Sequence, residues 1–117
     1  MLNYVHKDDC LFCKIIQGEI PCDKVFENEY VLGFKDIHPQ ASIHLLFIHK
    51  NHSDNFIEMT SEEVFQVHSA IKKYTSENLN GKGFRVVTNV GSDAGQSVFH
   101  THFHILSGNK FGAFGSK

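Results

Sequence analysis

The stretch His100-Thr101-His102-Phe103-His104-Ile105-Leu106 decides how this chain is interpreted. Its histidines recur at every second position, which is the period of a β-strand. In a strand the three imidazoles share one face, with neighbours about 6–7 Å apart, while Thr101, Phe103 and Ile105 face a core on the other side. Imidazole titrates near neutral pH, attacks electrophiles and binds metals, so this row of histidines predicts a chemical site.

The composition sets the class of protein. The 117 residues are 41% hydrophobic and 12% aromatic, which suffices for one domain with its own core, so we expect a single domain over residues 1–117 with short flexible ends at about 1–7 and 109–117. The net charge of −2 gives no electrostatic reason for nucleic-acid binding, and no apolar run approaches the roughly 18–20 residues of a membrane span. We therefore expect neither a nucleic-acid nor a membrane partner.

The cysteine content and the first nine residues indicate the cellular compartment of the protein. The chain has three cysteines, an odd number, and two of them stand as Cys10-Leu11-Phe12-Cys13. Residues 1–9 lack the basic and then apolar pattern of a signal peptide, so we expect a cytoplasmic, reducing environment. There such a pair is more often a metal or redox site than a disulfide.

Apolar periodicity and turn residues predict two helices and about five strands. A short helix is expected from a cap at Asp8 or Asp9 to Gln17, and a long one from the capping box Thr60-Ser61-Glu62-Glu63 to about Leu79, with Val64, Val67, His68 and Ile71 on its buried stripe. Strands are expected over residues 24–27, 30–35, 43–49, 84–89 and 98–106. Several strands follow one another directly, which favours an α+β fold with a mostly antiparallel sheet.

A glycine-bearing loop leads into the histidine strand. Glycines in Gly91-Ser92-Asp93-Ala94-Gly95-Gln96-Ser97 allow backbone N–H groups to approach an anion, and a hydroxyl adds a donor. Alone, the loop is more typical of a plain hairpin connection. The histidines that follow it favour a phosphate site instead.

The histidine row has two other interpretations. It could be a solvated strand face, or it could supply metal ligands, because His-x-His pairs on strands bind zinc or iron. A facial metal site needs a further ligand, and His44 could provide it.

The run His100–Leu106 resembles the His-φ-His-φ-His-φ-φ signature of the histidine triad (HIT) superfamily, in which φ is apolar and Thr101 is a mild departure. The resemblance extends from Cys10 to about Gly108 and includes Phe12–Ile16, Glu19–Pro21, Asp36–Ala41 and Gly91–Leu106. The histidine-triad nucleotide-binding (Hint) branch is the most similar, on the stretch Asn89–His100. Ser107-Gly108 stands where the fragile-histidine-triad branch has Pro-Arg.

The resemblance implies the HIT fold, in which two chains dimerise into a continuous larger sheet. It also implies hydrolysis of purine nucleoside phosphoramidates through a covalent nucleotidyl-histidine, with no cofactor for catalysis. The alternatives are a dinucleoside polyphosphate hydrolase or nucleotidyl transferase, and a nucleotide-binding scaffold with incidental activity. The tail after Asn109 lacks the tryptophan of the best-known eukaryotic members, which bears on the choice of leaving group.

By resemblance, each site residue receives a role. His102 is the nucleophile, the His100 carbonyl holds its ring, and His44 supports the catalytic ring. His104, Gly95, Gln96 and Ser97 hold the phosphate oxygens, and Ser97 also reaches the leaving group. Asn89 contacts the phosphate or ribose, and Asp36 accepts both ribose hydroxyls. Six apolar residues line the base pocket, although composition alone favours plain core for them: Leu11, Phe12, Ile15, Ile20, Phe34 and Ile37.

Family members that have this cysteine pair often contain a zinc site, and the resemblance implies the same site here. Its ligands would be Cys10, Cys13, His52 and His100, with His49 as an alternative to His52. Two thiolates and two imidazoles form a closed tetrahedral set, so zinc there would brace the fold and would not bind substrate. The other interpretation of the cysteine pair is two reduced thiols.

Overall fold

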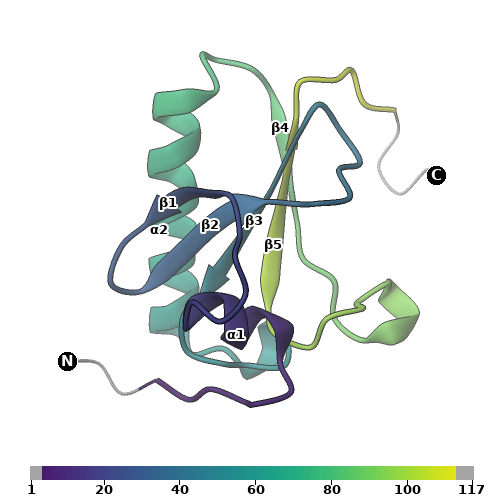
Figure 1. The fold of residues 1–117 in the computed structure, drawn as a ribbon. Helices are drawn as coiled ribbons and strands as arrows, with labels where there is room; N and C mark the ends of the chain where they lie inside the picture. The colour runs from purple at the N-terminus through teal and green to yellow at the C-terminus, as the bar shows by residue number, and fades with distance from the viewer. Residues whose placement is uncertain (1–3, 113–117) are drawn as a thin grey trace.

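Five strands form one antiparallel sheet in the order β1-β2-β3-β5-β4 (Figure 1). The computed structural model describes residues 4–112. Its strands are β1 Lys24–Glu27, β2 Val31–Lys35, β3 Ile43–His49, β4 Phe84–Val87 and β5 His102–Ser107. Its helices are α1 Leu11–Ile16 and α2 Ser61–Asn78, with short 3-10 turns η1 Phe56–Glu58 and η2 Ser92–Ala94. The predicted α+β fold is confirmed.

Alternation along the strands divides the core between the two faces of the sheet. Leu45 and Phe47 of β3 point towards α2, where they join Val67 and Ile71 in one cluster. Leu46 and Ile48 point the other way, into a second cluster with Phe12, Cys13 and Ile15 of the α1 region. Each helix therefore covers one face of the sheet, and the α1 face carries the chemistry described below.

Helix α2 begins as the sequence predicts. The Thr60 hydroxyl accepts from the Glu63 N–H at 3.1 Å, and the Glu63 carboxylate accepts from the Thr60 N–H at 3.0 Å. Val67 and Ile71 are buried and Val64 is half-buried, but His68 is exposed, so its assignment to the buried stripe is wrong. The His68 ring still lies at an edge-to-face angle to Phe103 of β5, with ring centroids 5.3 Å apart.

Helix α1 begins later than expected, because neither Asp8 nor Asp9 caps it. Cys10 occupies the cap position, and its Sγ accepts from the Cys13 N–H at 3.3 Å. Residues 4–7, assigned from sequence to a flexible end, lie beside the Cys10–Cys13 turn: the Val5 carbonyl accepts from the His52 N–H at 2.9 Å.

The histidine strand is shorter than predicted. It begins at His102, not Val98, because the pairing of β3 with β5 stops at Ile48 and His102. Similarly, β4 ends at Val87, not Asn89, since the Thr88 hydroxyl donates to the His102 carbonyl at 2.9 Å where a ladder bond would continue. Within residues 4–112, no helix has the length and apolar character needed to cross a membrane.

Candidate active site

His102 and His104 share the α1 face of the sheet, whereas His100 does not join them. His102 lies opposite Ile48 and His104 opposite Leu46, and their ring centroids are 5.0 Å apart. His100 precedes the strand and its ring is fully buried among other residues. The expectation of three imidazoles on one strand face is therefore wrong for His100. The opposite row is as predicted, because Thr101, Phe103 and Ile105 are all buried.

A pocket of about 490 Å³ opens beside these two histidines. Among its lining residues are all six predicted base-pocket residues and five of the predicted polar ones: Leu11, Phe12, Ile15, Ile20, Phe34, Ile37, Asp36, His44, Ser97, His102 and His104. Phe12, Ile15 and Phe34 also belong to the core behind it, but Ile37 is 85% exposed, as no core residue would be. Sequence reasoning did not assign the remaining lining residues: Pro21, Cys22, Lys35, His38, Gln40, Leu46 and Val98.

The His102 ring has one tautomer fixed by the backbone. Its Nδ1 lies 2.9 Å from the His100 carbonyl oxygen, which can only accept, so Nδ1 carries the proton. The lone pair is therefore on Nε2, on a residue that lines the pocket. Burial lowers the pKa of His102 and outweighs the opposing hydrogen bond to His100, which keeps the ring neutral and nucleophilic at neutral pH.

A relay of hydrogen bonds fixes the opposite tautomer in His104. The Gln40 backbone N–H donates to His44 Nδ1 at 2.9 Å, so neutral His44 carries its proton on Nε2. That Nε2–H faces His104 Nδ1 at 2.8 Å, which leaves the His104 proton on Nε2. Burial, with the neighbouring His102 and His44, lowers the pKa of His104 to about 4. The pocket thus contains a lone pair on His102 beside an N–H donor on His104.

Asp36 supports this relay from the start of the loop after β2. Its Oδ2 lies 3.4 Å from His44 Nε2, and its Oδ1 accepts from the His38 N–H at 2.8 Å. The carboxylate keeps unused acceptor capacity on the pocket wall.

The glycine loop is held in shape by its own side chains. Gln96 is buried; its Oε1 accepts from the Gly91 N–H at 2.8 Å, and its Nε2 donates to the Asp54 carbonyl at 2.6 Å. Asn89 donates to the Ala94 carbonyl at 2.8 Å. Gly91 and Gly95 have φ of +86° and +93°, which glycine adopts without strain. Of the four predicted loop residues, Ser97 lines the pocket, whereas Asn89, Gly95 and Gln96 are not among its lining residues.

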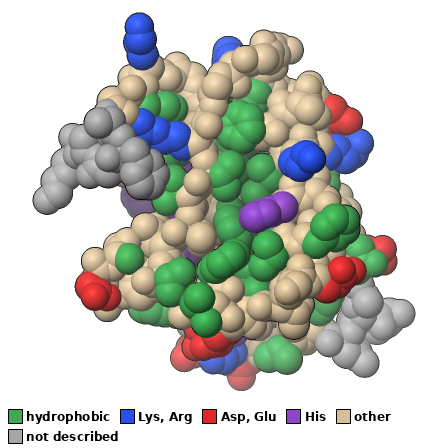
Figure 2. All heavy atoms as spheres, turned by 180° about the vertical axis from the view of Figure 1, so that it is seen from behind, with side chains coloured by type: hydrophobic (Ala, Val, Ile, Leu, Met, Phe, Trp, Pro, Cys, Tyr) green, Lys and Arg blue, Asp and Glu red, His purple; other side chains and the backbone are tan. Residues whose placement is uncertain are grey.

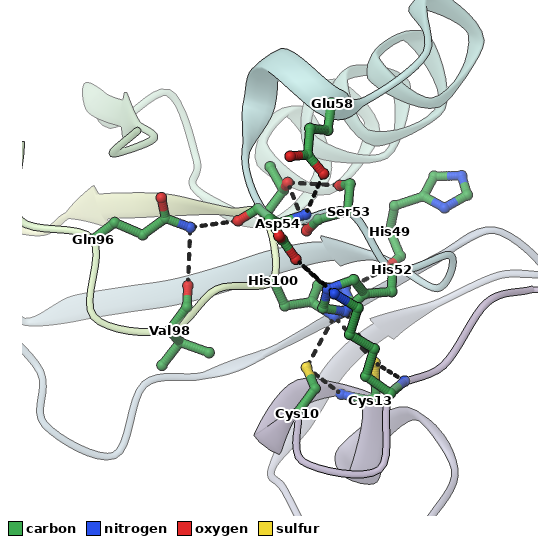
Figure 3. A network of polar contacts seen from close by, with 12 residues as sticks. Cys10, Cys13, His49, His52, Ser53, Asp54, Glu58, Gln96, Val98 and His100 are labelled. Atoms are coloured by element: carbon green, nitrogen blue, oxygen red, sulfur yellow. Dashed lines mark hydrogen bonds and ion pairs between the residues drawn. The ribbon is translucent and has the colours of Figure 1, made fainter. Parts of the chain in front are cut away.

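A second cluster lies behind the pocket, where Cys10, Cys13, His52 and His100 bring their ligand atoms within 4.8 Å of one another (Figure 3). His100 Nδ1 is 3.4 Å from Cys10 Sγ and 3.5 Å from Cys13 Sγ, and His52 Nδ1 is 3.3 Å from Cys13 Sγ. These are the four residues that the resemblance implies. The alternative ligand His49 is not among them, since its ring bonds Gln66 and the Asn51 N–H.

The donor set fits a tetrahedral zinc ion. With Zn–S about 2.3 Å and Zn–N about 2.0 Å, sulfur and nitrogen ligands lie about 3.5 Å apart, close to the spacings here. Each histidine also has the correct tautomer. His100 Nε2–H donates to the His49 carbonyl at 2.9 Å and His52 Nε2–H to Asp54 Oδ1 at 2.7 Å, so both Nδ1 atoms present lone pairs to the sulfurs. Sequence reasoning missed Asp54, although a carboxylate two positions after His52 is a usable signal.

Asp36, His44 and His104 form another group with metal-ligand chemistry, but it is not preset for a metal. The Gln40 N–H occupies His44 Nδ1 and so places a proton on Nε2, the atom that faces the other two residues. These residues are therefore arranged to hold a proton between them.

A profile of the HIT domain matches residues 17–111 of this chain. The chain belongs to the HIT family. This HIT protein is 48% identical over 101 residues to an uncharacterized HIT-like protein of Helicobacter pylori, covering 86% of this chain and 97% of the relative. Its fold matches a histidine triad protein from Clostridium difficile with a TM-score of 0.85 and 42% identity, over 94% of this chain and 99% of the other. A HIT family hydrolase from Clostridium thermocellum matches with a TM-score of 0.84 and 37% identity, over 92% and 96%.

Proposed function

We propose that this HIT protein hydrolyses purine nucleoside phosphoramidates through a covalent nucleotidyl intermediate on His102, the reaction expected of the Hint branch. One observation carries the proposal: the His102 Nε2 lone pair stands beside the His104 Nε2–H donor in a pocket with an apolar end. A nucleophile next to a donor is what attack on a negatively charged phosphorus requires.

The reaction has two steps. His102 Nε2 attacks the α-phosphorus, the P–N bond to the leaving amine breaks, and the amine departs with a proton delivered through the Ser97 hydroxyl and water. Water then attacks the same phosphorus, the P–N bond to His102 breaks, and nucleoside monophosphate leaves. The His104 N–H stabilises the charge on the phosphoryl oxygens in both steps.

Substrate recognition is assigned to the two walls of the pocket. Leu11, Ile15 and Phe34 supply an apolar slot for a purine ring, and Asp36 supplies the acceptor for the ribose hydroxyls. Because apolar contacts discriminate weakly between bases, we expect both adenosine and guanosine substrates to be accepted.

A substrate panel tests the proposal. We expect adenosine and guanosine phosphoramidates to be hydrolysed with higher kcat/KM than dinucleoside polyphosphates. Faster cleavage of dinucleoside polyphosphates would instead identify the alternative hydrolase or transferase. Nucleotide binding without turnover of either class would identify a binding scaffold. The comparison with the Clostridium thermocellum hydrolase supports an enzyme.

We also propose a structural zinc ion at Cys10, Cys13, His52 and His100, on the distances and tautomers given above. Bound there, zinc supplies a cross-link between the α1 turn, the loop after β3 and the segment before β5. The free thiols and the absence of disulfides among the described cysteines favour a reducing compartment, and we propose the cytoplasm.

We further propose a homodimer formed through α2 and the edge strand β4. Phe84 and Val86 are exposed on the α2 side of the sheet, and Phe65 of α2 is 66% exposed. Figure 2, the view from behind, shows hydrophobic side chains in a band with a histidine on it. An unpaired edge beside apolar residues suits a second copy. Sedimentation should show a dimer for wild type and a monomer for Val86→Asp; a monomeric wild type would contradict this proposal.

A further inference from the structure

His100 takes part in two sites: its carbonyl contacts His102 in the pocket, and its ring lies beside Cys10 and Cys13. Its backbone is not part of the β-sheet. Strand β5 starts two residues later, so no ladder bond fixes the His100 backbone. Its carbonyl nevertheless selects the tautomer of His102. The position of that carbonyl depends on whatever anchors His100 itself.

Two anchors are visible. The first is Thr101, whose N–H donates to the Ser53 carbonyl at 2.8 Å and whose hydroxyl lies 2.7 Å from that of Ser53. The second is the His100 ring, whose Nε2–H donates to the His49 carbonyl at 2.9 Å. Both partners, His49 and Ser53, lie in the segment that ends β3 and continues past it. His52 belongs to the same segment.

The Nδ1 edge of the His100 ring faces the two cysteines. Nδ1 lies between Cys10 Sγ and Cys13 Sγ at 3.4 and 3.5 Å, and the ring is fully buried. A neutral Nδ1 lone pair next to neutral thiols gains one weak S–H contact at most. A metal bond at Nδ1 would fix the ring at both ends and tie it to the α1 turn.

We propose that the metal bound by Cys10, Cys13, His52 and His100 positions the nucleophile: by fixing His100, it holds the carbonyl that keeps the His102 proton on Nδ1. The cysteines and His52 are therefore positioning residues for the reaction as well as braces of the fold. This inference rests on the proposed function for its kinetic readout, but not for its spectroscopic one.

The physical reason is that a neutral imidazole can carry its single proton on either Nδ1 or Nε2. If the His100 carbonyl shifts away, the His102 proton can move to Nε2, and the lone pair then leaves the pocket. The ring still fills the same space, so nucleotide binding changes little while attack on phosphorus slows. A purely structural metal would instead change stability and leave the His102 tautomer unaltered.

The test uses the whole chain in three states: zinc-loaded, stripped by chelator, and reloaded. Ring ¹⁵N shifts of His102 report which nitrogen carries the proton. We expect a single Nδ1–H form in loaded and reloaded protein and a tautomer mixture in stripped protein that is still folded. The same single form in all three states, or failure to bind zinc, overturns the proposal.

Variants separate positioning from stability. His52→Phe removes one ligand but keeps an aromatic ring beside His100, whose ring centroid lies 4.9 Å from that of His52. Ile71→Ala or Ile71→Val lowers stability from the opposite face of the sheet. At matched Tm, we expect His52→Phe to lose about tenfold or more in kcat with AMP affinity within about threefold of wild type. We expect the Ile71 variants to keep both. Equal loss of kcat in both kinds of variant overturns the proposal.

The proposed function can fail separately. If loaded protein hydrolyses no phosphoramidate, the phosphoramidase assignment falls, yet the ¹⁵N comparison still decides whether the metal sets the His102 tautomer.

Discussion

His102 donates its Nδ1–H to the carbonyl oxygen of His100, two residues earlier, at 2.9 Å. In a regular strand this bond is not available, because the carbonyl of one residue lies in the plane of the sheet and the side chain two residues on stands perpendicular to it. The chain must therefore leave the strand conformation at residues 98–101. The irregularity that shortens β5 is what orients the nucleophile.

Replacing the nucleophile should separate chemistry from binding. We expect His102→Ala to abolish phosphoramidate hydrolysis while nucleotide affinity stays within about tenfold, because one contact of this kind contributes about 1.4 kcal/mol or less. Rapid quench with labelled substrate should trap a nucleotidyl group on wild-type His102 and none on the variant. Activity within a few-fold of wild type in His102→Ala would rule out the nucleophile assignment.

Removing the charge of Asp36 should distinguish sugars. We expect Asp36→Asn to weaken the binding of ribonucleotides more than the binding of 2′-deoxyribonucleotides, because a carboxylate accepts hydrogen bonds from both ribose hydroxyls. The difference in binding free energy should be about 1.5–3 kcal/mol. The comparison of sugars matters because Asp36 also faces His44, and a disturbed relay would affect both substrates equally.

A surface carboxylate serves as the control for Asp36. Glu77 of α2 pairs with Lys73 at 2.9 Å, and neither residue lines the pocket. Glu77→Gln should leave the binding of both kinds of nucleotide unaffected. Equal losses for the two sugars in Asp36→Asn would make Asp36 structural.

The sequence correctly predicted those strand bounds and helix caps that depend on local periodicity and residue type. The bounds of β1 and β3 and the Thr60 capping box appear where the sequence placed them. The four cysteine and histidine residues that lie together are those that the family resemblance implied. The errors concern residues whose conformation is decided by partners far away in the chain. His100 lies outside the strand because the pairing of β3 with β5 stops at Ile48 and His102, and the alternation of histidines contains no sign of that end.

The proton positions in the pocket could not be predicted either. His44 is oriented by the Gln40 backbone N–H, and a backbone donor has no signature in the identity of the residue that carries it. Gln96 likewise looked like a phosphate contact, but its amide is used to fold the glycine loop around Gly91.

Metal content should follow the four ligands. We expect untagged protein prepared without chelator to contain about one zinc per chain. Because the binding energy of a structural metal is folding energy, chelator should lower the Tm of wild type. Cys10→Ser/Cys13→Ser should contain no zinc, melt near the chelated wild type and be insensitive to chelator. Sub-stoichiometric metal, with a double variant that melts like untreated wild type, would favour two reduced thiols.

Acid should destabilise the fold through the buried histidines of the pocket. The pKa of His104 is about 4 when folded, against an ordinary value of 6.5, and burial lowers that of His44 as well. Between these pH values the unfolded chain binds more protons than the native one, so stability is complete above about pH 6.5 and falls as pH drops towards 4.

We expect urea denaturation of wild type to show this loss, with a slope of at most about 1.4 kcal/mol per pH unit for each histidine. His104→Asn should have a shallower slope over the same range, and because zinc release in acid affects both proteins, the difference between them isolates His104. Parallel stability curves for wild type and His104→Asn would show that His104 does not titrate on unfolding, and would remove the case for a neutral N–H donor at that position.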